Sequence, residues 1–112
     1  MKRGEVWTLA GGVHYAGKPR PALILQDNRF DATDSITVCP FTTDTTDADL
    51  MRLPVEPNDA NGLRTPCRLM IDKIVTVPKD KLGQRIGHLG AADLARVGRA
   101  VVVFLGVADV AG

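Results

Sequence analysis

The apolar residues of this chain come in short, β-prone runs, and this pattern limits the fold more than any other feature of the sequence. Proline, glycine or a cluster of aspartates stops each run, which is typical of strands. Pro40 cannot donate to a strand ladder, so it predicts an edge, a bulge or a strand end. The predicted strands cover residues 5–10, 20–27, 35–43, 51–57 and 66–77, the last one bent or split near Asp72 and Lys73.

The spacing of the apolar residues changes at about Ala91. Helical spacing joins Leu94, Val97, Val101 and then Phe104 or Leu105. The β-branched run VVVF would also suit a strand, but the period and the end signals, including Gly106, agree over a longer window, so we predict a helix. Residues 79–85 are then a basic connection between the last strand and this helix.

These elements predict a mainly β protein, a small and partly open β-barrel with a C-terminal helix. The length of 112 residues suits one domain covering 1–112, and 45% apolar with 24% charged residues is a globular balance. No apolar run approaches the length of a membrane span, and MKRGEV lacks the apolar segment of a signal peptide, so we expect a cytoplasmic protein. The helix end VVVFLGV is more apolar than packing on one barrel requires, which indicates self-association.

The two cysteines, Cys39 and Cys67, sit in strand-like runs, and neither has another cysteine two or three residues away. We expect reduced, buried thiols, because a disulfide would require the two strands to be neighbours. His14 and His88 do not complete a zinc-binding set, so no metal and no other cofactor is expected.

The charges are unevenly spread along the chain although the net charge is only +1. Six aspartates and one arginine lie between residues 27 and 49, whereas six lysines or arginines and two aspartates lie between residues 64 and 85. A basic half of this kind could hold a polyanion. Solvated charges scattered over a barrel would give the same count, so charge alone leaves both interpretations open.

Arg20 stands between Pro19 and Pro21 at the start of a buried strand. The prolines stiffen the backbone and Pro21 favours extended geometry at Arg20, so the guanidinium is pre-organised for paired hydrogen bonds to phosphate. Thr42 and Thr43 end the third strand, where alternation lets one hydroxyl face a phosphate while the other faces away. We expect Arg20 and Thr42 to meet over a phosphate group, although each alone also fits an ordinary strand end.

Two titratable residues are candidates for proton transfer. His14 lies in a glycine-rich loop, and its unperturbed pKa of ~6.5 suits proton transfer near neutral pH. Asp72 interrupts the apolar run RLMIDKIV, where a carboxylate either pairs with a cation across the sheet or acts in a site. Arg68, four residues earlier on the same face, is the expected partner.

Several blocks of the sequence resemble the MazF/PemK/Kid family of toxin endoribonucleases. These are RGEVW, AGKPRPALILQ, ITVCPFTT, NGLRTPCRLMIDKIVTVPKDKLGQRIGHL and the closing apolar helix, in matching order and spacing over essentially the whole chain. The resemblance implies an SH3-like barrel with a terminal helix and a homodimer. It also implies metal-independent cleavage of single-stranded RNA and inhibition by a cognate antitoxin protein.

Carried over by this resemblance, the active arginine is Arg20 in KPRP and the active hydroxyl is Thr42 in PFTT. The Kid branch uses an Arg-x-Asp pair in proton transfer. Asp72 matches the aspartate, but Met70 stands where the arginine would be. That departure leaves Arg68 or Arg20 to supply the positive charge.

The implied reaction uses the 2′-OH of the RNA as nucleophile and leaves a 2′,3′-cyclic phosphate and a 5′-hydroxyl. We expect His14 as the general base, with Asp72 behind it. The other predicted RNA contacts are Tyr15, as a stacking side chain, with Lys18, Thr43, Arg68, Lys79 and Lys81.

Two alternatives stay open at this point. A gyrase poison of the CcdB type shares the barrel, but that family acts through a tryptophan near its C-terminus, whereas the only tryptophan here is Trp7. The second alternative is a non-catalytic SH3-like module that binds peptide or nucleic acid.

Overall fold

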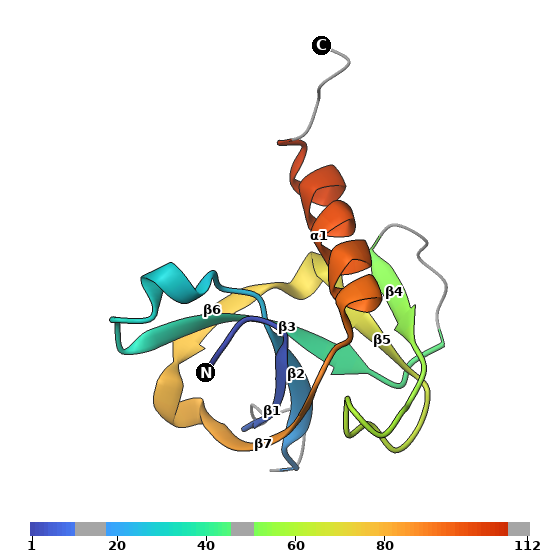
Figure 1. The fold of residues 1–112 in the computed structure, drawn as a ribbon, viewed down its shortest axis with the longest axis horizontal. Coiled ribbons are helices and arrows are strands. Elements are labelled where there is room, and N and C mark those ends of the chain that lie inside the picture. The colour runs from blue at the N-terminus through green and yellow to red at the C-terminus, as the bar shows by residue number, and fades with distance from the viewer. Residues whose placement is uncertain (11–17, 46–50, 108–112) are drawn as a thin grey trace.

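The computed structural model describes the chain except for residues 11–17, 46–50 and 108–112. Seven strands form one sheet, and a single α-helix follows them in the described part of the chain (Figure 1). The strands are β1 (Glu5–Leu9), β2 (Arg20–Ile24), β3 (Ser35–Thr42), β4 (Arg52–Val55), β5 (Cys67–Met70), β6 (Val75–Pro78) and β7 (Leu82–His88). The helix is α1 (Ala91–Leu105), and short 3-10 turns are η2 (Asn28–Phe30), η3 (Ile71–Lys73) and η4 (Lys79–Lys81).

The sheet is antiparallel, with the order β4-β5-β3-β2-β1-β7, and β6 also pairs with β3. The first half of β3 pairs with β6 through Val38, and the second half pairs with β5 from Phe41. Pro40 lies between the segment of β3 that pairs with β6 and the segment that pairs with β5, so its missing N–H interrupts neither ladder. The strand therefore changes partners on this edge near Pro40, the one residue of β3 whose backbone cannot donate.

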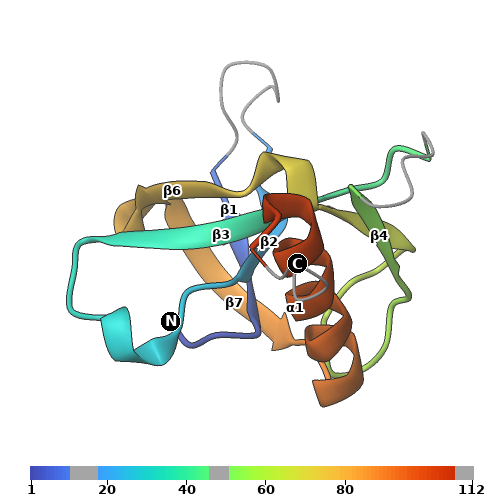
Figure 2. The ribbon, with the colours of Figure 1, turned by 90° about the horizontal axis from the view of Figure 1, so that it is seen from above.

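The predicted fold class, mainly β with a C-terminal helix, is confirmed, and the barrel is open. Among the described residues no strand pairing joins β7 to β6 or to β4, so the curled sheet does not close on itself. Seen from above, α1 lies on the β4 side, while β6 and β7 curve round the other side (Figure 2). The five predicted strands are all present, and the fifth is split by η3, as expected near Asp72.

The prediction of a basic connection over residues 79–85 is wrong. Residues 79–81 form η4, and β7 begins at Leu82 and pairs with β1. Gly83 and Gly87 weaken the strand signal of these residues in the sequence. A close contact between two backbone segments explains the glycine at position 87. A Cβ on Gly87 would collide with the main chain of Ala60 and Asn61, so the strand accepts a residue of poor β propensity there.

The apolar side chains divide into two clusters on opposite faces of the sheet. One includes Leu23, Phe41, Leu69 and Val97 of α1, and the other lies inside the curl around Ile24 and Val38. Both cysteines are buried and carry free thiols, as predicted.

The helix packs against η3 and β4 and ends as the sequence predicted. Gly106 has φ 69° and its N–H donates to the carbonyls of Val102 and Val103, the left-handed cap that glycine favours. The C-terminal half of α1 projects beyond the sheet (Figure 1). Large apolar side chains are therefore exposed there: Val103, Phe104, Leu105 and Val107.

Candidate active site

Strand register places Arg20 and Thr42 opposite each other at the open ends of β2 and β3. The pairs Ala22 with Pro40 and Leu23 with Cys39 fix an antiparallel register, and continuing it by two residues brings Arg20 beside Thr42. Residues two apart on a strand share a face, so both side chains leave the same side of the sheet. The predicted meeting of these two residues is thus built into the pairing of the strands.

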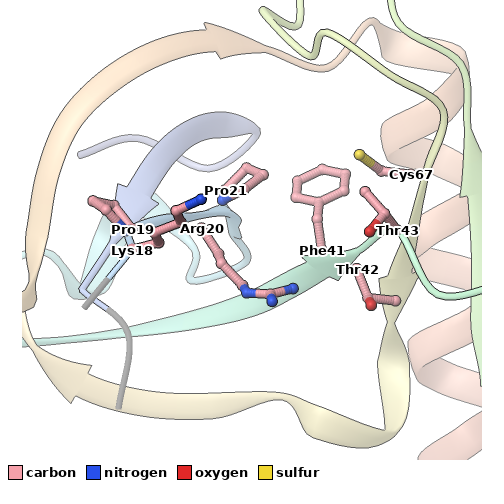
Figure 3. Close-up of a pocket in the computed structure, with 8 residues that line it drawn as sticks. All are labelled: Lys18, Pro19, Arg20, Pro21, Phe41, Thr42, Thr43 and Cys67. Atoms are coloured by element: carbon pink, nitrogen blue, oxygen red, sulfur yellow. The ribbon is translucent and has the colours of Figure 1, made fainter. Parts of the chain in front are cut away.

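Arg20 and Thr42 line one cavity of about 280 Å³. We call it the Arg20 cavity (Figure 3). The Arg20 guanidinium extends towards Thr42 on one side of β3, while the rings of Pro21 and Phe41 lie on the other side (Figure 3). The Thr42 Oγ1 accepts a hydrogen bond of 3.1 Å from the Asp44 N–H, which orients the hydroxyl and leaves its O–H to donate. The full lining is Lys18, Pro19, Arg20, Pro21, Phe41, Thr42, Thr43 and Cys67.

Two further cavities adjoin the Arg20 cavity around the end of β3. One, of about 170 Å³, includes Arg68 and is called the Arg68 cavity; the other, of about 630 Å³, includes Gln84 and is called the Gln84 cavity. Thr43 and Cys67 line all three cavities. The shared residues place the three cavities next to one another, and we call them together the strand-end cleft.

Arg68 flanks Thr42 on the side away from Arg20. Thr42 and Arg68 are direct partners in the pairing of β3 with β5. Thr42 therefore lies between Arg20 on β2 and Arg68 on β5. Lys18 and Thr43 also line the Arg20 cavity. Three of the predicted RNA contacts, Lys18, Thr43 and Arg68, are thus gathered at the cleft.

Asp72 pairs with a cation across the sheet, but the partner is not Arg68. The Arg52 Nε lies 3.1 Å from Asp72 Oδ1, and the Arg52 Nη2 donates to Oδ2 at 3.2 Å. Arg52 of β4 stands directly opposite Met70 of β5 in the strand register. The cation missing at Met70 is therefore supplied from the neighbouring strand, and the expectation that Arg68 or Arg20 would supply it is wrong.

Three of the predicted site residues that the structure describes lie outside the cleft. Asp72 lines none of the three cavities, and neither do Lys79 and Lys81. The Lys79 ammonium instead donates to the carbonyl and the carboxylate of Asp31. His14 and Tyr15 lie outside the described residues.

Both thiols are held in the protonated form. Burial, with a contribution from the negative charge of Asp72, raises the pKa of Cys39 to about 12. Burial also raises the pKa of Cys67, against the opposing effect of a hydrogen bond from the Thr65 side chain. A thiol is a poor nucleophile when its pKa is raised, so Cys67 acts as an apolar wall of the cleft.

The described residues contain no group of three histidines, cysteines or carboxylates that could hold a metal ion. No helix in the described part of the chain is long and apolar enough to cross a bilayer.

Sequence reasoning missed three residues that line the cleft, Arg64, Cys67 and Gln84, and it missed Arg52 as the partner of Asp72. The sequence predicts Cys67 as a core thiol, and Gln84 lies within residues 79–85, which the sequence predicts as a connection. Arg52 could have been found only from the register of β4 with β5, which the sequence does not carry.

Comparison with known proteins identifies the family. The family model described as PemK-like, MazF-like toxin of type II toxin–antitoxin system matches residues 2–105. This chain belongs to that toxin family. The "Probable endoribonuclease MazF" of Mycolicibacterium smegmatis is 55% identical to it over 108 residues, which cover 96% of this chain and 99% of the relative. The "Endoribonuclease MazF9" of Mycobacterium tuberculosis is 28% identical over 115 residues, 94% of this chain and 96% of the relative.

Solved structures of MazF-type toxins share the fold. A mycobacterial endoribonuclease in complex with its cognate antitoxin superposes with a TM-score of 0.77 at 26% identity, covering 96% of each chain. This chain is therefore a MazF-type toxin and an endoribonuclease, and the gyrase-poison and non-catalytic alternatives are not supported.

Proposed function

We propose that this MazF-type toxin cleaves single-stranded RNA at preferred sequences by attack of a 2′-OH on the adjacent phosphate, without a metal ion. The observation that carries the proposal is the placement of Arg20 and Thr42 on facing strand ends, lining one cavity. A guanidinium and a hydroxyl in fixed positions are donors suited to a phosphate whose negative charge increases in the transition state.

The reaction needs three events at the phosphate. A base takes the proton of the 2′-OH as its oxygen bonds to phosphorus, the bond from phosphorus to the 5′-oxygen breaks, and that oxygen gains a proton. The products are a 2′,3′-cyclic phosphate and a 5′-hydroxyl, and no water is consumed. In this scheme Arg20 and Thr42 stabilise the charge on the phosphoryl oxygens.

We assign the general base to His14, because its imidazole can accept a proton near neutral pH. The contacts of Asp72 support a different role for that residue. Its carboxylate is paired with Arg52 and lines none of the three cavities, so we place Asp72 outside the proton transfer.

The RNA strand follows the strand-end cleft in this proposal. Lys18, Thr43 and Arg68 contact its phosphates beside the scissile one, and Tyr15 stacks on a base. Lys79 and Lys81, which lie off the cleft, contribute at most long-range attraction, which salt screens.

The exposed apolar end of α1 supports a homodimer, because an apolar patch on the surface gains free energy when a second copy covers it. The related endoribonuclease solved with its cognate antitoxin supports an antitoxin protein as the inhibitor of this chain. We place the assembled protein, with residues 1–112 as one domain per copy, in the cytoplasm.

A cleavage assay in excess chelator tests the proposal. Purified protein should cut a single-stranded RNA and leave a 5′-hydroxyl end, and it should not cut the deoxy version of the same sequence. A requirement for added magnesium, or cleavage of the deoxy strand, would overturn the mechanism.

A further inference from the structure

Residues 56–66 connect β4 to β5 without a strand or a helix, and they border two of the three cavities. Glu56 lines the Arg68 cavity, whereas Leu63 and Arg64 line the Gln84 cavity. The connection therefore forms one side of the strand-end cleft, and we call it the 56–66 wall. Because it lacks a strand ladder, its backbone groups need other partners to stay in place.

Asn61 lies in the middle of the 56–66 wall, and its side chain is fully buried. Its Oδ1 accepts from the N–H of Asn58 at 3.1 Å and from the N–H of Leu63 at 3.0 Å, while its Nδ2 donates to the Glu56 carbonyl at 2.9 Å. These partners fix the orientation of the amide, because a turned-over amide would set donor against donor and acceptor against acceptor. No other polar or charged residue in the described part of the chain is buried to this degree.

The far side of the 56–66 wall is held against β7 by its main chain. The N–H of His88 donates to the Ala60 carbonyl at 2.8 Å. A Cβ on Gly87 would lie 2.4 Å from the Ala60 carbonyl oxygen. A Cβ on Gly62, which has φ +71°, would lie 2.1 Å from the Ile86 carbonyl oxygen, so this close approach requires glycine. The wall thus has one side fixed on β7 and one side facing the cleft.

Asn61 acts on the cleft only through its neighbours, since it lines none of the three cavities. Its hydrogen bonds join Glu56 of the Arg68 cavity to Leu63 of the Gln84 cavity. Arg64 and Thr65 follow Leu63 directly and line the Gln84 cavity as well. Loss of these bonds would free the cleft side of the wall to move relative to β3.

We propose that Asn61 is a positioning residue of this endoribonuclease, which holds the 56–66 wall at the spacing from β3 at which the RNA backbone binds. The inference rests on the proposed function only for the course of the RNA through the cleft. Arg20 and Thr42 are placed by the register of β2 with β3, which the wall does not set. Loss of the Asn61 amide should therefore weaken the binding of RNA and leave the chemical step nearly unchanged.

Steady-state cleavage of a single-stranded RNA by Asn61→Ala tests the inference. We expect the Michaelis constant to rise about tenfold and kcat to stay within about threefold of the unsubstituted value. Val97→Ala is the matched control, because it truncates another fully buried side chain, on α1, that lines none of the three cavities. The control should also lower the melting temperature, yet keep both kinetic constants when all proteins are assayed well below their melting temperatures.

Three results would overturn the inference. An unchanged Michaelis constant in Asn61→Ala would leave the residue a role in stability alone. An equal rise in Val97→Ala would trace the effect to lost stability. A fall in kcat at an unchanged Michaelis constant would place Asn61 in the chemical step instead of in binding.

The substitution Asn61→Asp tests the hydrogen bond to Glu56 by itself. It keeps the size of the side chain and the oxygen that accepts the two N–H groups, but a carboxylate oxygen replaces Nδ2 and faces the Glu56 carbonyl. We expect the Michaelis constant to rise in this variant too, and an unchanged value would overturn the inference. If Asn61→Ala does not fold, Asn61→Asp is compared with Val97→Ala in its place.

Binding of the deoxy version of the same strand separates this inference from the proposed function. That strand lacks the 2′-OH, so its affinity can be measured by fluorescence anisotropy without cleavage, and Asn61→Ala should bind it about tenfold more weakly. Weaker binding by Asn61→Ala, together with full cleavage of RNA by Arg20→Ala, defeats the proposed function and leaves the inference standing. Equal binding, or no binding, by Asn61→Ala and the unsubstituted protein defeats the inference and leaves the proposed function standing.

Discussion

The end of β3 and the end of α1 differ in what they leave exposed. At the end of β3, arginine, lysine and threonine side chains line the strand-end cleft. At the end of α1, the exposed side chains are apolar, and Leu105 is 58% exposed. The first surface suits a charged, hydrated polymer, whereas the second suits a surface like itself.

If Arg20 and Thr42 carry the reaction and the end of α1 carries the dimer, as proposed above, activity and assembly depend on different elements. The cleft depends on the register of β2, β3 and β5, and the apolar end depends on a helix that projects away from them (Figure 1). Substitutions in one region should therefore leave the other intact. The first three predictions below test this separation, and the fourth concerns a carboxylate that lies in neither region.

The largest effect is expected from Arg20→Ala. Removing one fixed donor to the phosphate should lower the cleavage rate by about 100- to 1000-fold. The dimer and the thermal midpoint should be unchanged, because Arg20 begins its strand at an exposed position. Arg29→Ala serves as the control, and a loss of cleavage smaller than tenfold would remove Arg20 from the reaction.

The converse substitution is Leu105→Glu. A carboxylate buried without a partner in an apolar interface should weaken the dimer at least tenfold, as measured by light scattering over a dilution series. Ala95→Glu, at an exposed position in the first half of α1, is the matched control. If both variants stay dimeric at the same dilution, the dimer uses another surface.

Substitutions in the Arg52–Asp72 pair should affect both regions through stability. The pair joins β4 to η3, η3 packs against α1, and both side chains are mostly buried, with 21% and 18% exposed. Arg52→Met should lower the free energy of unfolding by about 1–3 kcal/mol in urea titrations, because it leaves the mostly buried Asp72 carboxylate without its cation partner.

The double variant Arg52→Met with Asp72→Leu should regain most of that stability, since no charge is then left unpaired. Cleavage by the double variant well below its melting temperature should be close to normal. A large loss of cleavage with stability restored would return Asp72 to the reaction.

The smallest effect concerns Glu5, which lies in neither region. Burial alone would raise the pKa of Glu5, but hydrogen bonds from the Lys2 N–H and the Trp7 indole, with the charges of Arg85 and the N-terminus, outweigh it and lower the pKa below the ordinary 4.5. A lowered pKa means that the carboxylate stabilises the fold above about pH 4.5 and loses this effect as the pH falls.

Glu5→Gln should therefore lower stability by about 0.5 kcal/mol at pH 7 and converge with the unsubstituted protein at low pH. Fluorescence of Trp7, the only tryptophan, reports the unfolding. A difference in stability between the two proteins that grows as the pH falls would contradict the lowered pKa of Glu5.

The sequence predicted much of this architecture because the decisive signals were local. Strand runs bounded by proline and glycine, and the helical period ending at Gly106, act over a few residues. The family resemblance pointed to Arg20 and Thr42. The partner of Asp72 and the Gln84 cavity could not be predicted, because each depends on how distant strands align.

Pro40 has a consequence for the time at which the toxin becomes active. Because β3 changes partners there, its site-bearing half is completed by β5, whose residues come about 25 positions after Thr42 along the chain. A nascent chain that has been synthesised only as far as β4 still lacks Cys67 and Arg68, which line the cleft. We expect RNA cleavage to begin only after β5 has been synthesised and has paired with β3.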